Sequence, residues 1–230
     1  MFKIKKDPTK VMILATGPGW DLAPKETEKI VYALNDFVAV ERYKVMPDFL
    51  FLMDILDEKP QVVSGQTPLP DMIRRLNALR VPFLAPFKYE EIPSSIAFPL
   101  EAVVKKFGLP YFTNTICYMI AYALLQGAKE IETYGVNQAG SHEYSEEKGG
   151  VEYWLGVAIG MGVKVTVHGN QSQLMKYKGR YGNSMLYGYL QNYQEIQSNK
   201  ERFGEVNIRK LLKPSTPFER KVEMTRQINP

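Results

Sequence analysis

Short apolar runs that end on glycine or on a polar residue recur along the chain, and this feature constrains the fold most. The run Val11 to Thr16 (VMILAT) breaks at Gly17-Pro18-Gly19, as expected of a strand that is buried on both faces and ends in a turn. Two similar runs follow, Lys29 to Leu34 before Asn35-Asp36 and Asp48 to Met53 before Asp54. We therefore predict three strands whose carboxyl ends carry turn-forming or polar residues.

Helical segments and further strands alternate after these runs. The spacing of apolar residues predicts helices over 71–79, 99–107, 113–126 and 152–161, and strands over 81–86, 131–136 and 164–167. This alternation predicts an α/β fold with a Rossmann-like, mostly parallel sheet, right-handed crossovers and helices on both faces. Residues 59–70 are expected to form a surface loop. Gly156 and Gly160 are expected where the last of these helices packs closely on the sheet.

The domain organisation follows from length and from a change of character late in the chain. With 230 residues, 45% of them hydrophobic, the chain can bury one large core. We predict one nucleotide-binding domain over 1–190 and a C-terminal tail over 191–230, with a helix near 183–202. The tail carries large apolar residues in charged sequence, which predicts burial against a second copy and hence a homo-oligomer. Packing of the tail on its own subunit is the open alternative.

Composition limits the classes of partner. No apolar run approaches the ~20 residues of a membrane helix, and the first ten residues lack a signal-peptide stretch, so we expect a cytoplasmic protein without membrane contact. One cysteine and two histidines form no zinc pattern, so no structural metal is expected, and Cys117 is interpreted as a core residue. The net charge of +4 is spread along the chain, which makes nucleic acid an unlikely partner. The basic, tyrosine-containing stretch 176–181 is expected to be a solvated loop.

The candidate ligand site lies where the predicted strands end, because ligands of open parallel sheets bind outside the carboxyl ends of the strands. Glycine in the turn after the first strand lets a ligand approach the backbone, and hydroxyl groups beside free helix-terminal amides suit a phosphate. Each feature alone also fits an ordinary turn or helix cap. The candidate ligand-binding residues are Thr16, Gly17, Pro18, Gly19, Asn35, Asp36, Asp54, Thr113, Asn114, Thr115, Gly135, Val136, Asn137 and Tyr144.

A polar stretch after Gly135-Val136-Asn137 is the candidate catalytic segment. We expect residues 138–150 to form a loop that covers the sheet edge as a lid or substrate wall. His142 stands beside Glu143 there, and this pair is the candidate for acid–base work. A solvated loop histidine is the alternative.

The order of these motifs resembles a known group of proteins. Strand-Gly-Pro-Gly, strand-Asn-Asp, TNTICYMIAYALLQGAKEIETYGVN, an HEY segment and EYWLGVAIGMGVKV follow one another over about residues 10 to 190. In this the chain resembles phage-encoded Rossmann-like proteins related to the 6-hydroxymethylpterin diphosphokinase-like family. It is similar, more distantly, to bacterial sialyltransferases that use CMP-sialic acid.

The resemblance implies a nucleotide pocket made by residues 17–19, Asn35, 113–115 and 135–137 and, for a phage protein, a place in the host cytoplasm. Relatives usually carry Gly-Pro-Ser at 17–19 and an aspartate at Asn137. An amide there removes a potential metal ligand, which argues against metal-dependent diphosphate transfer. Two functions stay open: a transferase, glycosyl or phosphoryl, with a nucleotide or nucleotide-sugar donor, and a non-catalytic binder that sequesters a nucleotide signal of the host and so acts against host defence. No cofactor is assigned.

Overall fold

The computed structural model describes residues 5–34, 45–54, 62–63, 67–139, 142–169, 172–177 and 180–181. By its internal contacts the chain divides into two units, Met1–Leu174 and Met175–Pro230. The first unit contains the sheet and all described helices. The described part of the second unit is a two-stranded antiparallel hairpin, β10 (Lys176–Tyr177) and β11 (Arg180–Tyr181), where the sequence predicted a loop.

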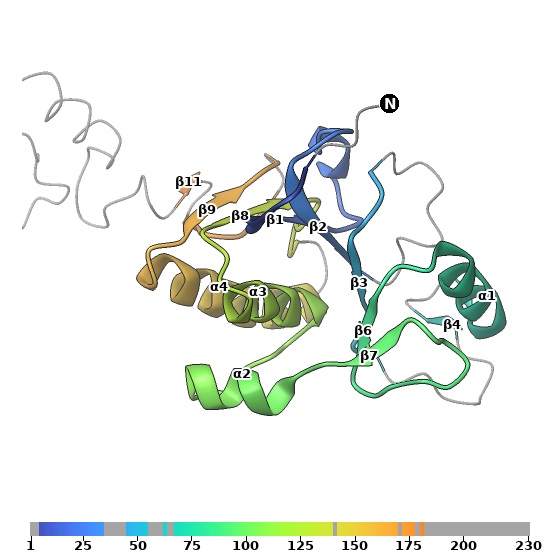
Figure 1. Cartoon of the computed structure of the whole chain (residues 1–230). Coiled ribbons are helices and arrows are strands. Elements are labelled where there is room, and N and C mark those ends of the chain that lie inside the picture. The colour runs from blue at the N-terminus through green and yellow to red at the C-terminus, as the bar shows by residue number, and fades with distance from the viewer. Residues whose placement is uncertain are drawn as a thin grey trace, which may run out of the picture. The chain divides into compact units, whose positions relative to one another are not determined.

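The sheet has seven parallel strands in the order β7-β6-β3-β2-β1-β8-β9 (Figure 1). Their bounds are β1 Asp7–Leu14, β2 Lys29–Leu34, β3 Phe49–Phe51, β6 Phe83–Ala85, β7 Ser95–Ala97, β8 Glu130–Tyr134 and β9 Lys164–Val167. The chain adds strands outward from β1 to β7 and then returns to the other side of β1 with β8. This reversal makes the gap between the carboxyl ends of β1 and β8 the switch point of the sheet.

Burial explains why strand β1 could be predicted. Residues 11–14 of β1 are almost wholly inaccessible, because helices cover both faces of the sheet at this position. The predicted α/β, Rossmann-like parallel fold is therefore confirmed. The short edge strand β7 was not predicted, because three residues without an apolar run give no strand pattern.

Helices form a layer on each side of the sheet. On one face lie α2 (Leu100–Phe107), α3 (Thr115–Leu125) and α4 (His142–Gly160) (Figure 1). On the other face, Met72 and Leu76 of α1 (Leu69–Leu79) and Trp20 of the short 3-10 helix η1 (Trp20–Leu22) join an apolar cluster with Met12 and Leu14 of β1. Helix α3 is buried nearly all round, and Cys117 lies inside it as a free, buried thiol.

The first half of α4 corrects the predicted loop over 138–150, because residues 142–150 are helical. Gly149 and Gly150 disfavour a helix in the sequence, but Gly150 packs under the start of α3. A Cβ there would come within 2.2 Å of the Thr113 Oγ1 atom, so close packing requires glycine. Tertiary contact has overridden local propensity.

The expectation for Gly156 and Gly160 is wrong. Both glycines are exposed on α4, and a Cβ at either position would meet nothing within 4 Å. The face of α4 that packs inward carries Trp154, Leu155 and Ala158 instead.

The predicted loop over 59–70 contains the antiparallel pair β4 (Val62–Val63) and β5 (Thr67–Pro68) and the start of α1. The helix predicted near 183–202 and the tail lie outside the described residues. Among the described residues, no helix has the length and hydrophobicity to span a membrane.

Candidate functional site

The loops that follow β1 and β8 meet at the switch point. The Ala15 N–H donates to the Tyr134 carbonyl (2.9 Å), and the Gly17 N–H donates to the Gly135 carbonyl (3.0 Å). A Cβ at Gly17 would lie 2.5 Å from the Gly135 oxygen, and a Cβ at Gly135 would lie 2.5 Å from the Ala15 oxygen. Gly135 also has φ +70°, which favours glycine. Both positions therefore need glycine, and the two loops meet backbone to backbone.

The loop after β9 closes the other side of the Gly17–Gly19 turn. Gly19 has φ +93°, and a Cβ there would lie 3.3 Å from the Gly169 Cα. The turn is thus held between the ends of β8 and β9. Within it, the Gly17 N–H is already bonded and Pro18 has none, which leaves the Gly19 N–H as the amide of the turn that can meet a ligand.

Two amide side chains in the loop after β8 contain buried acceptors. The Asn137 Oδ1 and Gln138 Oε1 atoms are buried and have no hydrogen-bond partner among the described residues. The Asn137 Cγ lies 3.5 Å from the position of a Cβ at Gly17. The backbone beside them is fixed, because Val136 accepts from the Ser172 Oγ and Asn137 accepts from the Gln173 N–H, both at 2.8 Å. An unsatisfied buried acceptor costs about 1–3 kcal/mol, which a ligand donor would recover.

The start of α3 divides the three predicted residues into two roles. Asn114 caps the helix, since its Oδ1 accepts from the Cys117 N–H (3.2 Å), and its Nδ2 donates to the Glu147 Oε2 (3.0 Å). The Thr113 Oγ1 donates to the Glu147 carbonyl (2.7 Å). These two residues tie α3 to α4. The half-buried Thr115 hydroxyl makes no hydrogen bond with a described residue.

The other predicted residues fall outside this junction or outside the described residues. Asp54 is exposed after β3, and Tyr144 is exposed in the first turns of α4. Asn35 and Asp36 lie outside the described residues, as do the side chains of His142 and Glu143. The acid–base role of His142 and Glu143 stays a prediction.

Sequence reasoning missed a polar cluster made by Glu132, Tyr134 and His168. Glu132 pairs in register with Met12, which places it on the sheet face that carries the apolar cluster. The Tyr134 hydroxyl donates to the Glu132 Oε2 (3.0 Å), and the His168 Nε2 lies 3.5 Å from the same oxygen. The His168 and Tyr134 rings are stacked, with centroids 4.2 Å apart and 5° between planes.

Charged groups surround this cluster. The Lys29 Nζ lies 2.7 Å from the Glu132 Oε1 and also pairs with Glu130. Burial, and next the hydrogen bond to the Glu132 carboxylate, raise the pKa of the Tyr134 phenol. The Lys29 ammonium holds the pKa of the Glu130 carboxyl below its usual range. Two signals could have found the cluster: the alternation Glu130, Glu132, Tyr134 along one strand, and a histidine directly after another.

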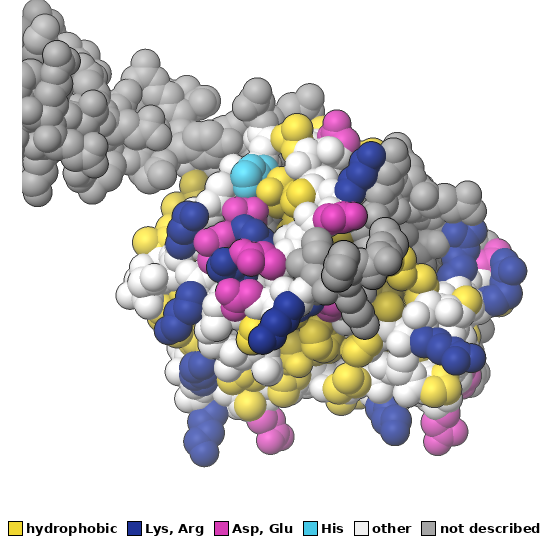
Figure 2. Space-filling model, turned by 45° about the horizontal axis from the view of Figure 1, so that its top comes forward, with side chains coloured by type: hydrophobic (Ala, Val, Ile, Leu, Met, Phe, Trp, Pro, Cys, Tyr) yellow, Lys and Arg dark blue, Asp and Glu magenta, His cyan; other side chains and the backbone are white. Residues whose placement is uncertain are grey.

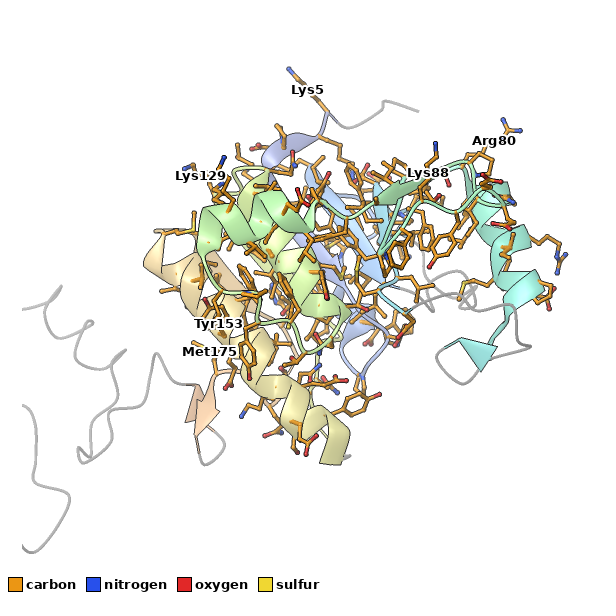
Figure 3. The ribbon with its side chains drawn as sticks, turned by 90° about the horizontal axis from the view of Figure 1, so that it is seen from below. Lys5, Arg80, Lys88, Lys129, Tyr153 and Met175 are labelled. Carbon is orange, nitrogen blue, oxygen red and sulfur yellow. The ribbon has the colours of Figure 1, made fainter. Side chains whose placement is uncertain are left out.

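Among the described residues, no group of three or more His, Cys, Asp or Glu side chains is arranged to hold a metal ion. Basic side chains occur at the opposite edge of the sheet, where Lys5 precedes β1 and Lys129 precedes β8 (Figure 3). Among the described residues, the amide acceptors, the glycine turn and the Thr115 hydroxyl are groups with which the carboxyl edge can meet a ligand.

Comparison with known proteins gives a likeness to solved structures and nothing at the level of sequence families. No family model matches the chain, and no curated protein matches it. Among solved structures, the chain is similar to the sialyltransferase CstII from Campylobacter jejuni in complex with a substrate analogue, cytidine-5'-monophosphate. The two share 15% sequence identity with a TM-score of 0.45, over 74% of this chain and 87% of that chain. The pterin diphosphokinase-like family and a phage origin stay expectations from the sequence.

Proposed function

We propose that the chain binds a nucleotide at the switch point between β1 and β8. The observation that carries this proposal is the junction of Gly17, Gly135 and Asn137, where backbone without side chains lies beside a buried acceptor that meets no donor from the described part of the chain. A sugar hydroxyl or the amino group of a base would supply the missing donors. The Thr115 hydroxyl and the first free amides of α3 would take a phosphate, because α3 must begin at the carboxyl edge to lead into β8.

For the reaction, we propose a transferase that uses a nucleotide or nucleotide-sugar donor. Support comes from the position of His142 and Glu143 at the start of α4, a few residues after the Asn137 loop. An imidazole can accept and donate a proton near neutral pH, and a carboxylate can accept one.

A non-catalytic nucleotide binder is the second candidate. The neutral amides of Asn137 and Gln138 favour it, because they bind a donor group but transfer no proton. Retention of an intact nucleotide, without turnover, would be the function of such a protein.

The test is mass spectrometry of small molecules that the purified full chain retains, followed by calorimetry with a panel of nucleotides and nucleotide sugars. We expect one ligand to bind, Asn137→Ala to weaken it about tenfold or more through loss of a buried hydrogen bond, and the exposed control Gln126→Ala to leave affinity unchanged. Turnover of the ligand selects the transferase, and intact retention selects the binder. A folded chain that binds nothing in the panel would contradict the proposal.

Metal dependence is tested on the same ligand. Because Asn137 offers an amide where the family that the sequence resembles usually carries a carboxylate, binding is expected to survive EDTA. Loss of binding in EDTA that magnesium restores would show that the site needs a divalent cation.

A further inference from the structure

The last side chains before two of the site loops are stacked on each other. Tyr134 ends β8 and precedes Gly135, while His168 follows β9 and precedes Gly169. Their rings lie 4.2 Å apart and nearly parallel. The Tyr134–His168 stack therefore joins the ends of the two strands that flank one side of the switch point.

One carboxylate binds the tyrosine of this stack and lies near its histidine. The Glu132 Oε2 accepts from the Tyr134 hydroxyl at 3.0 Å and lies 3.5 Å from the His168 Nε2, while its Oε1 pairs with Lys29 at 2.7 Å. The side chains of Glu132 and Lys29 are each only 15% exposed, so water screens their attraction weakly. Figure 2 shows acidic and basic side chains gathered on one face beside a histidine.

The two residues of the stack are joined through their backbone to the loops of the candidate site. The Tyr134 carbonyl accepts from the Ala15 N–H, and the adjacent Gly135 accepts from Gly17. The His168 N–H donates to the Thr133 carbonyl (2.9 Å), and the adjacent Gly169 packs on Gly19. A shift of either ring would move one of the loops that enclose the Gly17–Gly19 turn.

We propose that Glu132, Tyr134 and His168 are positioning residues, which fix the loops after β8 and β9 against the Gly17–Gly19 turn and thereby set the affinity of the site. The effect on affinity rests on the proposed nucleotide function. The effect on the loops does not, because it can be measured on the full chain without ligand.

Amide hydrogen exchange is the test, since Ala15 and Gly17 donate the bonds that join the loops. In His168→Ala, we expect exchange of these two amides to rise about two- to tenfold, as loss of an aromatic pair predicts. The Lys129 amide, which donates to Thr9 at the opposite edge, should keep its rate. His168→Phe, which keeps a ring for stacking, should restore most of the protection.

Lys164→Ala is the matched control, because Lys164 pairs with Glu130 in the same charged group but at the start of β9. It should leave the Ala15 and Gly17 amides unchanged. If His168→Ala does not fold, Tyr134→Phe keeps the stack and removes the hydroxyl bond to Glu132, with a smaller rise expected at the same amides.

Unchanged exchange at Ala15 and Gly17, or an equal rise at Lys129, would overturn the proposal, since the stack would then have no local effect on the loops. Nucleotide affinity gives the second measurement: loosened loops with unaltered affinity would refute the positioning role. If the wild-type chain binds no nucleotide, the proposed function fails, and the exchange result still decides whether the stack fixes the loops.

Discussion

Two separate constraints, one on the backbone angle φ and one on the space for a side chain, require glycine at position 135. Its φ of +70° disfavours any side chain, and a Cβ would also come within 2.5 Å of the Ala15 carbonyl oxygen. Gly127 shares the first constraint, with φ +86°, but a Cβ there would meet nothing within 4 Å. The pair distinguishes backbone strain from steric exclusion at the site.

We predict that Gly135→Ala destabilises the chain more than Gly127→Ala. A strained φ alone costs about 1–3 kcal/mol, and the contact with Ala15 adds to it at Gly135 only. Urea unfolding of both variants measures the difference. Equal losses would show that the loops after β1 and β8 separate easily enough to admit a methyl group.

Neighbouring residues at the start of α3 should respond differently to alanine. Asn114→Ala removes a cap and the bond to Glu147, so we predict a loss of about 1–2 kcal/mol of stability. Thr115→Ala removes a hydroxyl without a described partner, so we predict weaker nucleotide binding with little change in stability. Unfolding and calorimetry on both variants test this, and unchanged affinity in Thr115→Ala would exclude this hydroxyl from the site.

At the scale of elements, the predictable parts of the fold are those that local sequence controls. Both faces of strand β1 are buried over residues 11–14, so it has a continuous apolar run, and this run alone was enough to predict it. The first half of α4 was missed because its glycines disfavour a helix. Gly150 is required there by its contact with Thr113, which lies 37 residues earlier, and no local sequence pattern reveals that contact. The Tyr134–His168 stack was missed for a similar reason, since only the pairing of β8 with β9 brings the two rings together.

The candidate ligand site was only partly predictable from the sequence. The glycine turn and Asn137 could be assigned to the carboxyl edge because they come soon after strands, a position that the sequence reveals, while their role in binding stays a prediction. The roles of Thr113 and Asn114 could not be predicted, because their contacts with Glu147 depend on how α3 and α4 pack.

Helix α4 offers a direct test at this scale. Gly156 and Gly160 are exposed in the helix with open space around them, so alanine should stabilise the chain by about 0.5–1 kcal/mol per position. Thermal unfolding of the double variant measures the gain. A loss of stability instead would indicate that another surface packs closely on these glycines in solution.

At the scale of the whole molecule, we expect the C-terminal tail to determine the oligomeric state. The segment 191–230 places large apolar residues among charged ones, namely Tyr193, Ile196, Phe203, Val206, Ile208, Leu211, Leu212 and Phe218. A chain segment that stays unfolded has no need of so many apolar side chains, so we expect a surface that buries them. Exchange of such arms across a two-fold axis is a low-cost route to a dimer.

We predict that the full chain is a dimer and that a chain ending near Asn192 is a folded monomer. Burial of the apolar tail residues on a second copy supplies the free energy of association, so removing them removes the dimer. Light scattering gives the mass of each form, and circular dichroism confirms that the shortened chain keeps its α/β fold. A monomeric full chain would show that the tail packs on its own subunit, and a dimer that survives truncation would place the interface within the first 192 residues.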